Sequence, residues 1–302
     1  MKNQTFTPSL ETKIENAIFN IFDTETTGDN SRGTDKPIEI AAVRWKLNEG
    51  FMEIPKSWMV DPGMPIHPSA IGVHGIEDEE LEGKPPIEQI LPELHDYIKD
   101  TVLVAHNIQF DLNMLPTVDE KNNLKLDCLR FARHIFKIGD LGHKGQDLRS
   151  HKSQELRYWL GIKVDTMGLQ AHRAAADILV TGEVFNQTLK RFIERTNATT
   201  LEELNDFINA PIMAEVMRFG KFKDRKIAEV VQEEAKKSNN YFAWLLREVH
   251  KGNMPQVDAD LKYTIEYHLK QNNIDPAGLL VEEVQKTWQG IAQQATRNFK
   301  AK

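Results

Sequence analysis

The segment AIFNIFDTETTG, residues 17–28, decides the fold and also carries the first chemically active groups. Its apolar start, residues 17–22, predicts a buried strand, and the polar run DTETTG begins where that strand ends. Asp23 and Glu25 are two residues apart, and alternate residues of an extended chain lie on one face. Both carboxylates therefore point to one place at the edge of a sheet, where a divalent cation would relieve their repulsion.

Two further segments place acids beside the ends of predicted elements. HNIQFD, residues 106–111, follows the apolar run TVLVA and ends in Asp111. HRAAAD, residues 172–177, stands at the head of a helical pattern. Each segment alone has a structural explanation, such as an aspartate that caps a helix. Three acidic clusters at element ends instead indicate one shared site.

The order of the predicted elements indicates an α/β domain. Residues 17–22, 38–47 and 51–60 read as consecutive strands, and close connections between such strands make them antiparallel. Residues 87–98 have helical spacing, and residues 101–105 form a short buried strand that we expect to be parallel to its neighbour. The acids then lie around one edge of a mixed sheet, where open α/β sheets commonly bind ligands.

Four acids and one histidine resemble the motif set of the DnaQ-like (DEDDh) 3′ to 5′ exonucleases over residues 14–195: Asp23, Glu25, Asp111, His172 and Asp177. The tripeptide HGI at residues 74–76 adds to this resemblance. Residues 217–271 are similar to the C-terminal module of the exonuclease X branch. The resemblance implies a ribonuclease H-like mixed five-stranded sheet flanked by helices, followed by a small α+β module.

The chain of 302 residues has room for one core of moderate size and a smaller second unit. Thr200 and Glu203 have the spacing of a capping box, which predicts a short helix between the two units. We expect a loose N-terminal arm, an exonuclease domain, a connector helix, the exonuclease X-like module and a helical tail, at residues 1–13, 14–195, 196–211, 212–271 and 272–302.

Cysteine content and hydropathy limit the class of protein. A single cysteine, Cys128, excludes an intrachain disulfide, and we expect its thiol to be buried. The sequence has no run of about 18 apolar residues, and its first nine residues are polar. We therefore expect no membrane partner and a cytoplasmic location.

The net charge of −7 is concentrated in one segment. Residues 74–100 contain nine acids and two lysines, which account for all of it. Residues 134–173 contain seven lysines and arginines against four acids, and a local positive surface beside a metal site suits a phosphate backbone. A solvated loop explains the same charges. Residues 139–153 are longer and more basic than the corresponding loop of the family that they resemble, so substrate preference is the least transferable property.

Carboxylate oxygens suit two Mg²⁺ or Mn²⁺ ions, the arrangement that hydrolyses phosphodiesters in many nucleases. We expect Asp23 to bridge both ions, Glu25 and Asp177 to complete one site, and Asp111 to support the other. On one helix, five residues would turn His172 about 140° away from Asp177, so we expect His172 on the loop before the helix. It would then act as the general base, because imidazole titrates near neutral pH.

Further residues are candidate substrate contacts. By resemblance, the loop that holds His74 lies near the terminal nucleotide. Thr24 and Thr26 flank the acids, and Phe110 either stacks on a base or belongs to the core. In the C-terminal module, FGKFKDRK interleaves aromatic residues with cations that could grip a nucleic-acid backbone, namely Lys221, Lys223 and Arg225. A small hairpin with solvated lysines is the alternative, and Asp224 stands where relatives usually have glycine.

The sequence thus predicts a metal-dependent 3′ to 5′ exonuclease that hydrolyses single-stranded or frayed ends of DNA to 5′-mononucleotides, in DNA repair or recombination. Two alternatives remain open. One is an RNA-trimming exoribonuclease, because the same chemistry cleaves RNA and the contacts that select the sugar lie in loops. The other is a non-enzymatic or proofreading partner subunit, against which stand the five matching positions and the additional module.

Overall fold

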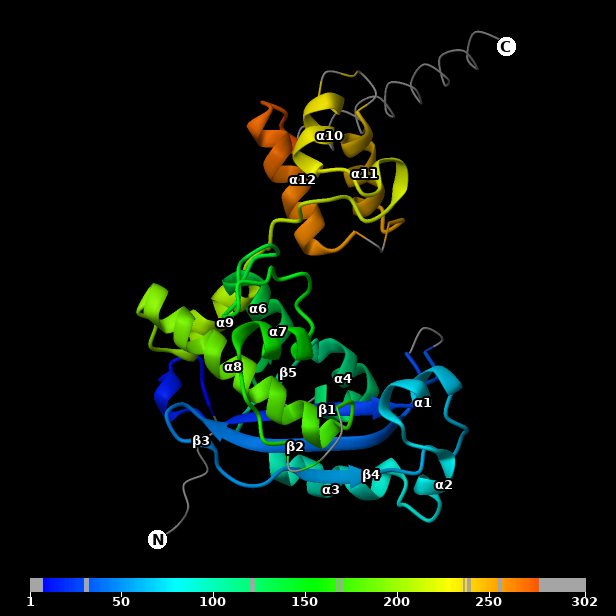
Figure 1. Cartoon of the computed structure of the whole chain (residues 1–302). Helices are drawn as coiled ribbons and strands as arrows, with labels where there is room; N and C mark the ends of the chain where they lie inside the picture. Colours follow the sequence, from blue (N-terminus) through cyan, green and yellow to red (C-terminus); the bar gives the residue numbers. More distant parts are fainter. Residues whose placement is uncertain are drawn as a thin grey trace, which may run out of the picture. The chain divides into compact units, whose positions relative to one another are not determined.

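The chain forms two compact units, divided between Ala210 and Pro211 (Figure 1). Each unit has its own hydrophobic core. The computed structural model describes residues 8–29, 33–119, 123–166, 168, 171–235, 237, 240–254 and 257–276. Among the described helices, none is both long and apolar enough to span a lipid bilayer.

The first unit is built on a mixed sheet (Figure 1). The central strand β1 (Phe19–Thr26) pairs antiparallel with β2 (Pro37–Lys46) and parallel with β5 (Val102–Ala105). The edge strand β6 (Lys125–Asp127) pairs parallel with β5. The predicted α/β class and the predicted strand directions are confirmed.

The sheet has six strands, where we expected five. The segment predicted as one strand over residues 51–60 is divided into β3 (Gly50–Phe51) and β4 (Lys56–Met59), which both pair with β2. Pro55 lies between them, and a proline has no N–H to donate to a sheet. Strand β6 has three residues, too few for a periodic pattern to reveal it.

Helices cover both faces of the sheet. Phe19 and Ile21 of β1 face one core, to which these α-helices contribute: α6 (Cys128–Ile135), α7 (Ser153–Leu160), α8 (Ala174–Thr196) and α9 (Leu201–Asn209). Cys128 is buried there, as predicted. Phe22 faces the opposite core, built with α3 (Ile87–Ile98) and α4 (Ile108–Met114). Short helices complete the unit: η1 (Ile14–Asn16), α1 (Pro68–His74), α2 (Asp78–Leu81) and α5 (Pro116–Asp119).

Two segments that were expected to be peripheral are attached to the first unit. The predicted capping box of Thr200 and Glu203 begins α9, but Leu204 and Ile208 of this helix are buried in the core, so α9 is not a free connector. The described end of the N-terminal arm is held by backbone hydrogen bonds, including those from Leu201 to Thr12 and from Glu202 to Leu10. Backbone hydrogen bonds hold this segment in place, and they do not depend on its side chains. Its polar composition therefore wrongly suggested a loose arm.

The second unit is a small helical assembly. It contains the 3₁₀ helix η2 (Gly220–Phe222) and the helices α10 (Ile227–Glu234), α11 (Tyr241–His250) and α12 (Ala259–Gln271). We expected an α+β module, but extended pairing in its described residues is limited to a single bridge, Val216 with Lys226. Most of the predicted helical tail, residues 277–302, lies outside the described residues.

Candidate active site

Strand β1 directs its two acids toward helix α8. Residues 19, 21, 23 and 25 alternate with the residues that face the other core, so Asp23 and Glu25 continue the face of Phe19 and Ile21. This face packs against α8, whose first turn carries Asp177. The apolar half of the strand thus anchors the helix, and the acidic half meets its N-terminal end.

Three carboxylates meet at this point. Oxygen atoms of Asp23, Glu25 and Asp177 all lie within 4.8 Å of one another. Three acids so close would repel one another in the absence of a counter-charge, and hard oxygen ligands are what Mg²⁺ and Mn²⁺ prefer. The residues present therefore fit a divalent cation, as the sequence predicted.

Asp111 is not one of these three acids, although its repulsion is the largest charge effect that raises the pKa of Asp23. It is buried near the start of α4, where its Oδ1 accepts a hydrogen bond of 2.9 Å from the Thr24 hydroxyl. Thr24 continues the face of Phe22, which packs against α4 rather than α8. The sequence did not reveal this bond, because two residues 87 positions apart show no pattern in common. The expected support of a second ion by Asp111 stays a prediction.

The carboxyl groups hold their protons more tightly than isolated acids do. Burial and then repulsion from Asp111 and Glu25 raise the pKa of Asp23. Burial, then repulsion from Asp177, raises the pKa of Glu25 to about 8. Burial also raises the pKa of Asp111 to about 7. Burial raises the pKa of Asp177 as well, although a hydrogen bond from Gln154 opposes this shift. A bound cation would reverse these shifts, because it stabilises the ionised forms.

The metal-free protein should therefore lose stability as the pH rises from about 4.5 to about 8. The pKa of Glu25 rises from 4.5 to about 8 in the folded chain, so the folded state binds more protons in this window and the free energy of unfolding falls. A cation replaces these protons. Saturating Mg²⁺ or Mn²⁺ should thus raise the melting temperature by roughly 5–10 °C at pH 8 and by less at pH 5.5. Calorimetry with EDTA or metal at both pH values tests this, and equal increments would contradict it.

His172 lies outside helix α8, as predicted. The helix begins at Ala174, and His172 takes a left-handed backbone conformation with φ of 62°. Its side chain is 52% exposed, and its Nδ1 lies 3.8 Å from Oδ2 of Asp177. An exposed imidazole at the rim of a carboxylate cluster can reach a water or a substrate there.

A buried glutamate holds the turn that carries His172. Glu39 of β2 lies opposite Glu25 in the sheet, and its carboxylate accepts hydrogen bonds from Arg173 Nε at 3.0 Å and from the Ala174 N–H at 3.2 Å. The Ser57 hydroxyl donates a third bond of 2.9 Å. Our sequence analysis missed Glu39, although a lone acid in the apolar strand PIEIAAVRW was a usable signal. Arg173 is consequently an ion-pair partner rather than part of the predicted basic surface.

Glu39→Gln should destabilise the protein by about 3 kcal/mol and reduce kcat more than KM. A glutamine can keep one oxygen for Arg173 Nε and the Ala174 N–H, but it loses the charge that pairs with Arg173 and places an amide NH₂ where Oε1 accepts from Arg173 Nη2 and the Ser57 hydroxyl. Denaturant unfolding and steady-state kinetics measure the two effects. In a double-mutant cycle, adding Arg173→Gln should cost less than it does alone. Additive losses would show that the pair does not position His172.

The comparison with known proteins identifies the family. The family model described as an exonuclease, RNase T, matches residues 21–185, more than half of the chain. The chain belongs to this exonuclease family. The exonuclease domain is 31% identical over 198 residues to the PolC-type DNA polymerase III of Streptococcus suis, and 32% identical over 210 residues to that of Halalkalibacterium halodurans. These alignments cover 64% and 68% of this chain but only 12% and 13% of the polymerases.

A solved exonuclease has the same fold. A structure of Exonuclease X in complex with 5′ overhanging duplex DNA is 26% identical, with a TM-score of 0.50 over 63% of this chain and 99% of that one. E. coli Exonuclease I in complex with a dT13 oligonucleotide is 20% identical, with a TM-score of 0.49 over 60% of this chain and 43% of that one. The predicted membership of the DnaQ-like superfamily is thus confirmed.

The predicted substrate contacts of the exonuclease domain are largely occupied within the protein. His74 is buried, its Nδ1 accepts the N–H of Ile76, and its Nε2 lies 3.3 Å from the carbonyl of Thr26. The Thr26 hydroxyl donates to the carbonyl of Gly28. Phe110 is half-buried against the α3 and α4 core. The backbone of the His74 loop, rather than its ring, is left to meet a nucleotide, and that contact stays a prediction.

The cations of the C-terminal unit are mostly paired. Lys221 lies 3.4 Å from the buried Glu234, and Arg225 makes a two-pronged pair with Glu233. Among the three predicted contacts, Lys223 has no ion-pair partner in the described residues. Asp224 takes the left-handed conformation with φ of 65°, which a glycine adopts with less strain. A grip on nucleic acid by this unit stays a prediction.

Proposed function

We propose that the chain is a metal-dependent 3′ to 5′ exonuclease that hydrolyses single-stranded or frayed DNA ends to 5′-mononucleotides. The main support for this proposal is that oxygen atoms of Asp23, Glu25 and Asp177 lie within 4.8 Å of one another, in a domain of the exonuclease family. A structural relative, Exonuclease X, was solved with DNA, which supports a DNA substrate for this chain as well.

The side chains divide the chemistry among them. Asp23, Glu25 and Asp177, supported by Asp111, would hold two Mg²⁺ or Mn²⁺ ions. When bound, such ions neutralise charge on the phosphate and promote ionisation of water. His172 would accept the proton of the attacking water, since its ring is exposed at the rim of the cluster. Glu39 and Arg173 would keep the His172 turn in position.

A second candidate is a nuclease that serves a DNA polymerase as a proofreading partner. The observation that favours it is the 31–32% identity to PolC-type polymerases, of which this chain spans a small part. A separate proofreading chain would have to bind a polymerase to act. The two candidates share the site and differ in whether the chain alone degrades DNA.

A panel of labelled oligonucleotides tests the proposal. Single-stranded DNA, duplex DNA and RNA of one sequence are incubated with the full chain and Mg²⁺ or EDTA. We expect immediate release of a mononucleotide from a 3′-labelled DNA strand and a shortening ladder from a 5′-labelled one, both stopped by EDTA. Degradation of RNA alone would favour the exoribonuclease. If none of the three substrates were hydrolysed, the partner subunit would be favoured. The Asp23→Asn protein, prepared identically, controls for contaminating nucleases.

A further inference from the structure

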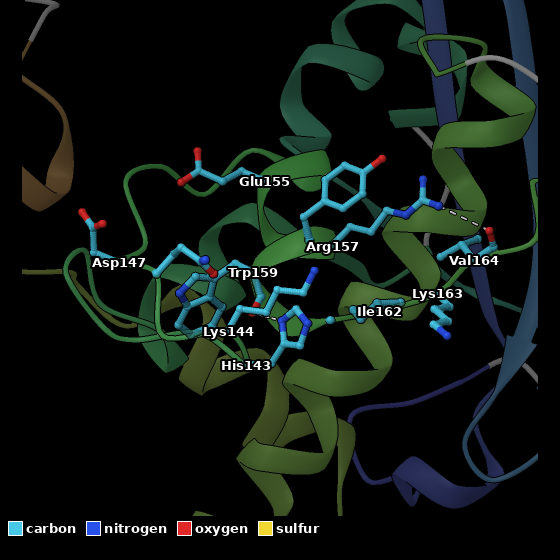
Figure 2. Close-up of a pocket in the computed structure, with 12 residues that line it drawn as sticks. His143, Lys144, Asp147, Glu155, Arg157, Trp159, Ile162, Lys163 and Val164 are labelled. Carbon is cyan, nitrogen blue, oxygen red and sulfur yellow. Dashed lines mark hydrogen bonds between the residues drawn. The ribbon is translucent and has the colours of Figure 1, made fainter.

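The first unit contains a cavity lined by residues of the basic loop and of helix α7 (Figure 2). Its volume is about 810 Å³, within the range of pockets that bind organic ligands. One wall is the basic loop around His143 and Lys144, and the other is the C-terminal half of α7 with residues 161–164. Neither the carboxylate cluster nor its histidine lines this cavity.

The walls of the cavity are held in place by the protein itself. The His143 N–H donates to the Trp159 carbonyl at 3.1 Å, and the Trp159 indole N–H donates to the Asp140 carbonyl at 3.1 Å. A Cβ atom at Gly142 would lie 2.5 Å from the Trp159 carbonyl oxygen, so only glycine allows the loop this close. The cavity is therefore preformed, and ordering it costs a ligand little.

The cavity presents cations that lack carboxylate partners. Lys144 and Lys163 enter from two separate segments, and neither has an ion-pair partner in the described part of the chain (Figure 2). The two acids of the lining are engaged elsewhere. Glu155 accepts the N–H groups of Arg149 and Ser150, and Asp147 lies 3.3 Å from Nε of Arg149. The net effect is a positive pocket suited to phosphate.

An aromatic platform stands beside these cations. Tyr158 is 68% exposed, which is unusual for so large a ring on a helix that packs on a core. The guanidinium of Arg157 lies 5.2 Å from the centre of that ring, and its Nη2 donates to the Val164 carbonyl (Figure 2). Exposed aromatic rings interleaved with cations are the usual surface on which single-stranded nucleic acid stacks.

Helix α7 connects this platform to the carboxylates. Near its start, Gln154 donates a hydrogen bond of 2.9 Å from Nε2 to Oδ1 of Asp177. Arg157, Tyr158 and Gly161 follow at three, four and seven residues, so they continue the face of Gln154. Tyr158 follows Gln154 by four residues, which span about 6 Å of helix, and this corresponds to roughly two nucleotides at the 3.4 Å spacing of a stacked strand.

We propose that this cavity is a subsite for the substrate strand, binding a nucleotide about two positions to the 5′ side of the scissile bond. The base stacks on Tyr158, and the flanking phosphates contact Lys144 and Lys163. The inference rests on the proposed function, since it assumes that the strand's 3′ end occupies the carboxylate site. It gives the basic loop a role in substrate length preference.

The first test is the dependence of kcat/KM on the length of oligothymidylates from two to ten nucleotides. For the parent protein, kcat/KM should rise until the subsite is filled. Tyr158→Ala should lower kcat/KM for the ten-mer about 5- to 100-fold and for the dinucleotide less than twofold. Tyr158→Phe keeps the ring and should retain the length dependence. An equal loss at every length, or no loss at all, would overturn the subsite.

Binding measurements separate this inference from the proposed function. Fluorescence anisotropy with the Asp23→Asn protein reports binding of the labelled ten-mer without hydrolysis. Lys144→Ala with Lys163→Ala should reduce the salt dependence of binding by about 1.4 in the log–log slope, whereas Lys190→Ala, an exposed lysine of α8, should not. If the parent protein hydrolysed no DNA but the variants showed this pattern of binding, the proposed function would be wrong and the subsite would stand. Binding of dTMP that depends on Tyr158, with no dependence on strand length, would instead make the cavity a free-nucleotide pocket and overturn the inference.

Discussion

Asp23→Asn is expected to reduce release of mononucleotides from single-stranded DNA by at least about a thousandfold while the protein stays folded. Asp23 has acidic neighbours from separate elements: Glu25 and Asp177 lie beside it, and repulsion from Asp111 raises its pKa. Without its charge the site would lose the ligand best placed to contact a cation. The measurement is the initial rate of hydrolysis under saturating Mg²⁺ or Mn²⁺.

The same substitution should stabilise the metal-free protein. Removing one of several repelling carboxylates raises the metal-free melting temperature at pH 8, by roughly 2–4 °C if the relief is near 1 kcal/mol. Loss of activity with gain of stability separates a functional role from misfolding. Glu79→Gln, which neutralises an exposed acid of the same unit, should change neither property. Retention of more than a tenth of the activity by Asp23→Asn would contradict the proposed site.

His172→Ala is expected to lower kcat by about a hundred- to ten-thousandfold, the usual contribution of a general base. The side chain is half-exposed, and its Nδ1 lies 3.8 Å from Oδ2 of Asp177, so its removal should leave the core intact. Cation binding should persist, because His172 is not among the three clustered acids. The increase in melting temperature on adding Mn²⁺ should therefore match that of the parent.

Free imidazole gives a sharper test of this role. Alanine at position 172 leaves a space at the rim of the site, and added imidazole should restore part of the rate in proportion to its concentration. Imidazole should have no such effect on the Asp23→Asn protein. If His172→Ala kept hydrolysis within a factor of ten of the parent, the assignment of the base would be wrong.

Local patterns were sufficient for much of the fold. The alternation in residues 17–25 predicted both the central strand and the shared face of Asp23 and Glu25. The spacing of His172 and Asp177 predicted that the histidine precedes the helix, because helical geometry excludes the alternative. The helix over residues 87–98 has the predicted bounds for the same reason.

The shortcomings have a common cause. The prediction of a single strand over residues 51–60 did not take account of Pro55, which has no N–H to donate. The prediction of a connector did not take account of where Leu204 and Ile208 could be buried. Pairing between distant residues leaves no local trace. The ion pair of Glu39 with Arg173 joins residues 134 positions apart, and that of Lys221 with Glu234 neutralises a predicted DNA contact.

The sequence by itself determined the strand and helix that carry the acids, since their periodicity reflects which side of each element must leave water. It also determined the residue types, and hence the chemistry, available to the site. Only the tertiary structure decided that Asp111 accepts a hydrogen bond from Thr24, that Glu39 secures the His172 turn, and that the basic loop lines a cavity. These depend on contacts between segments that only the folded chain brings within bonding distance.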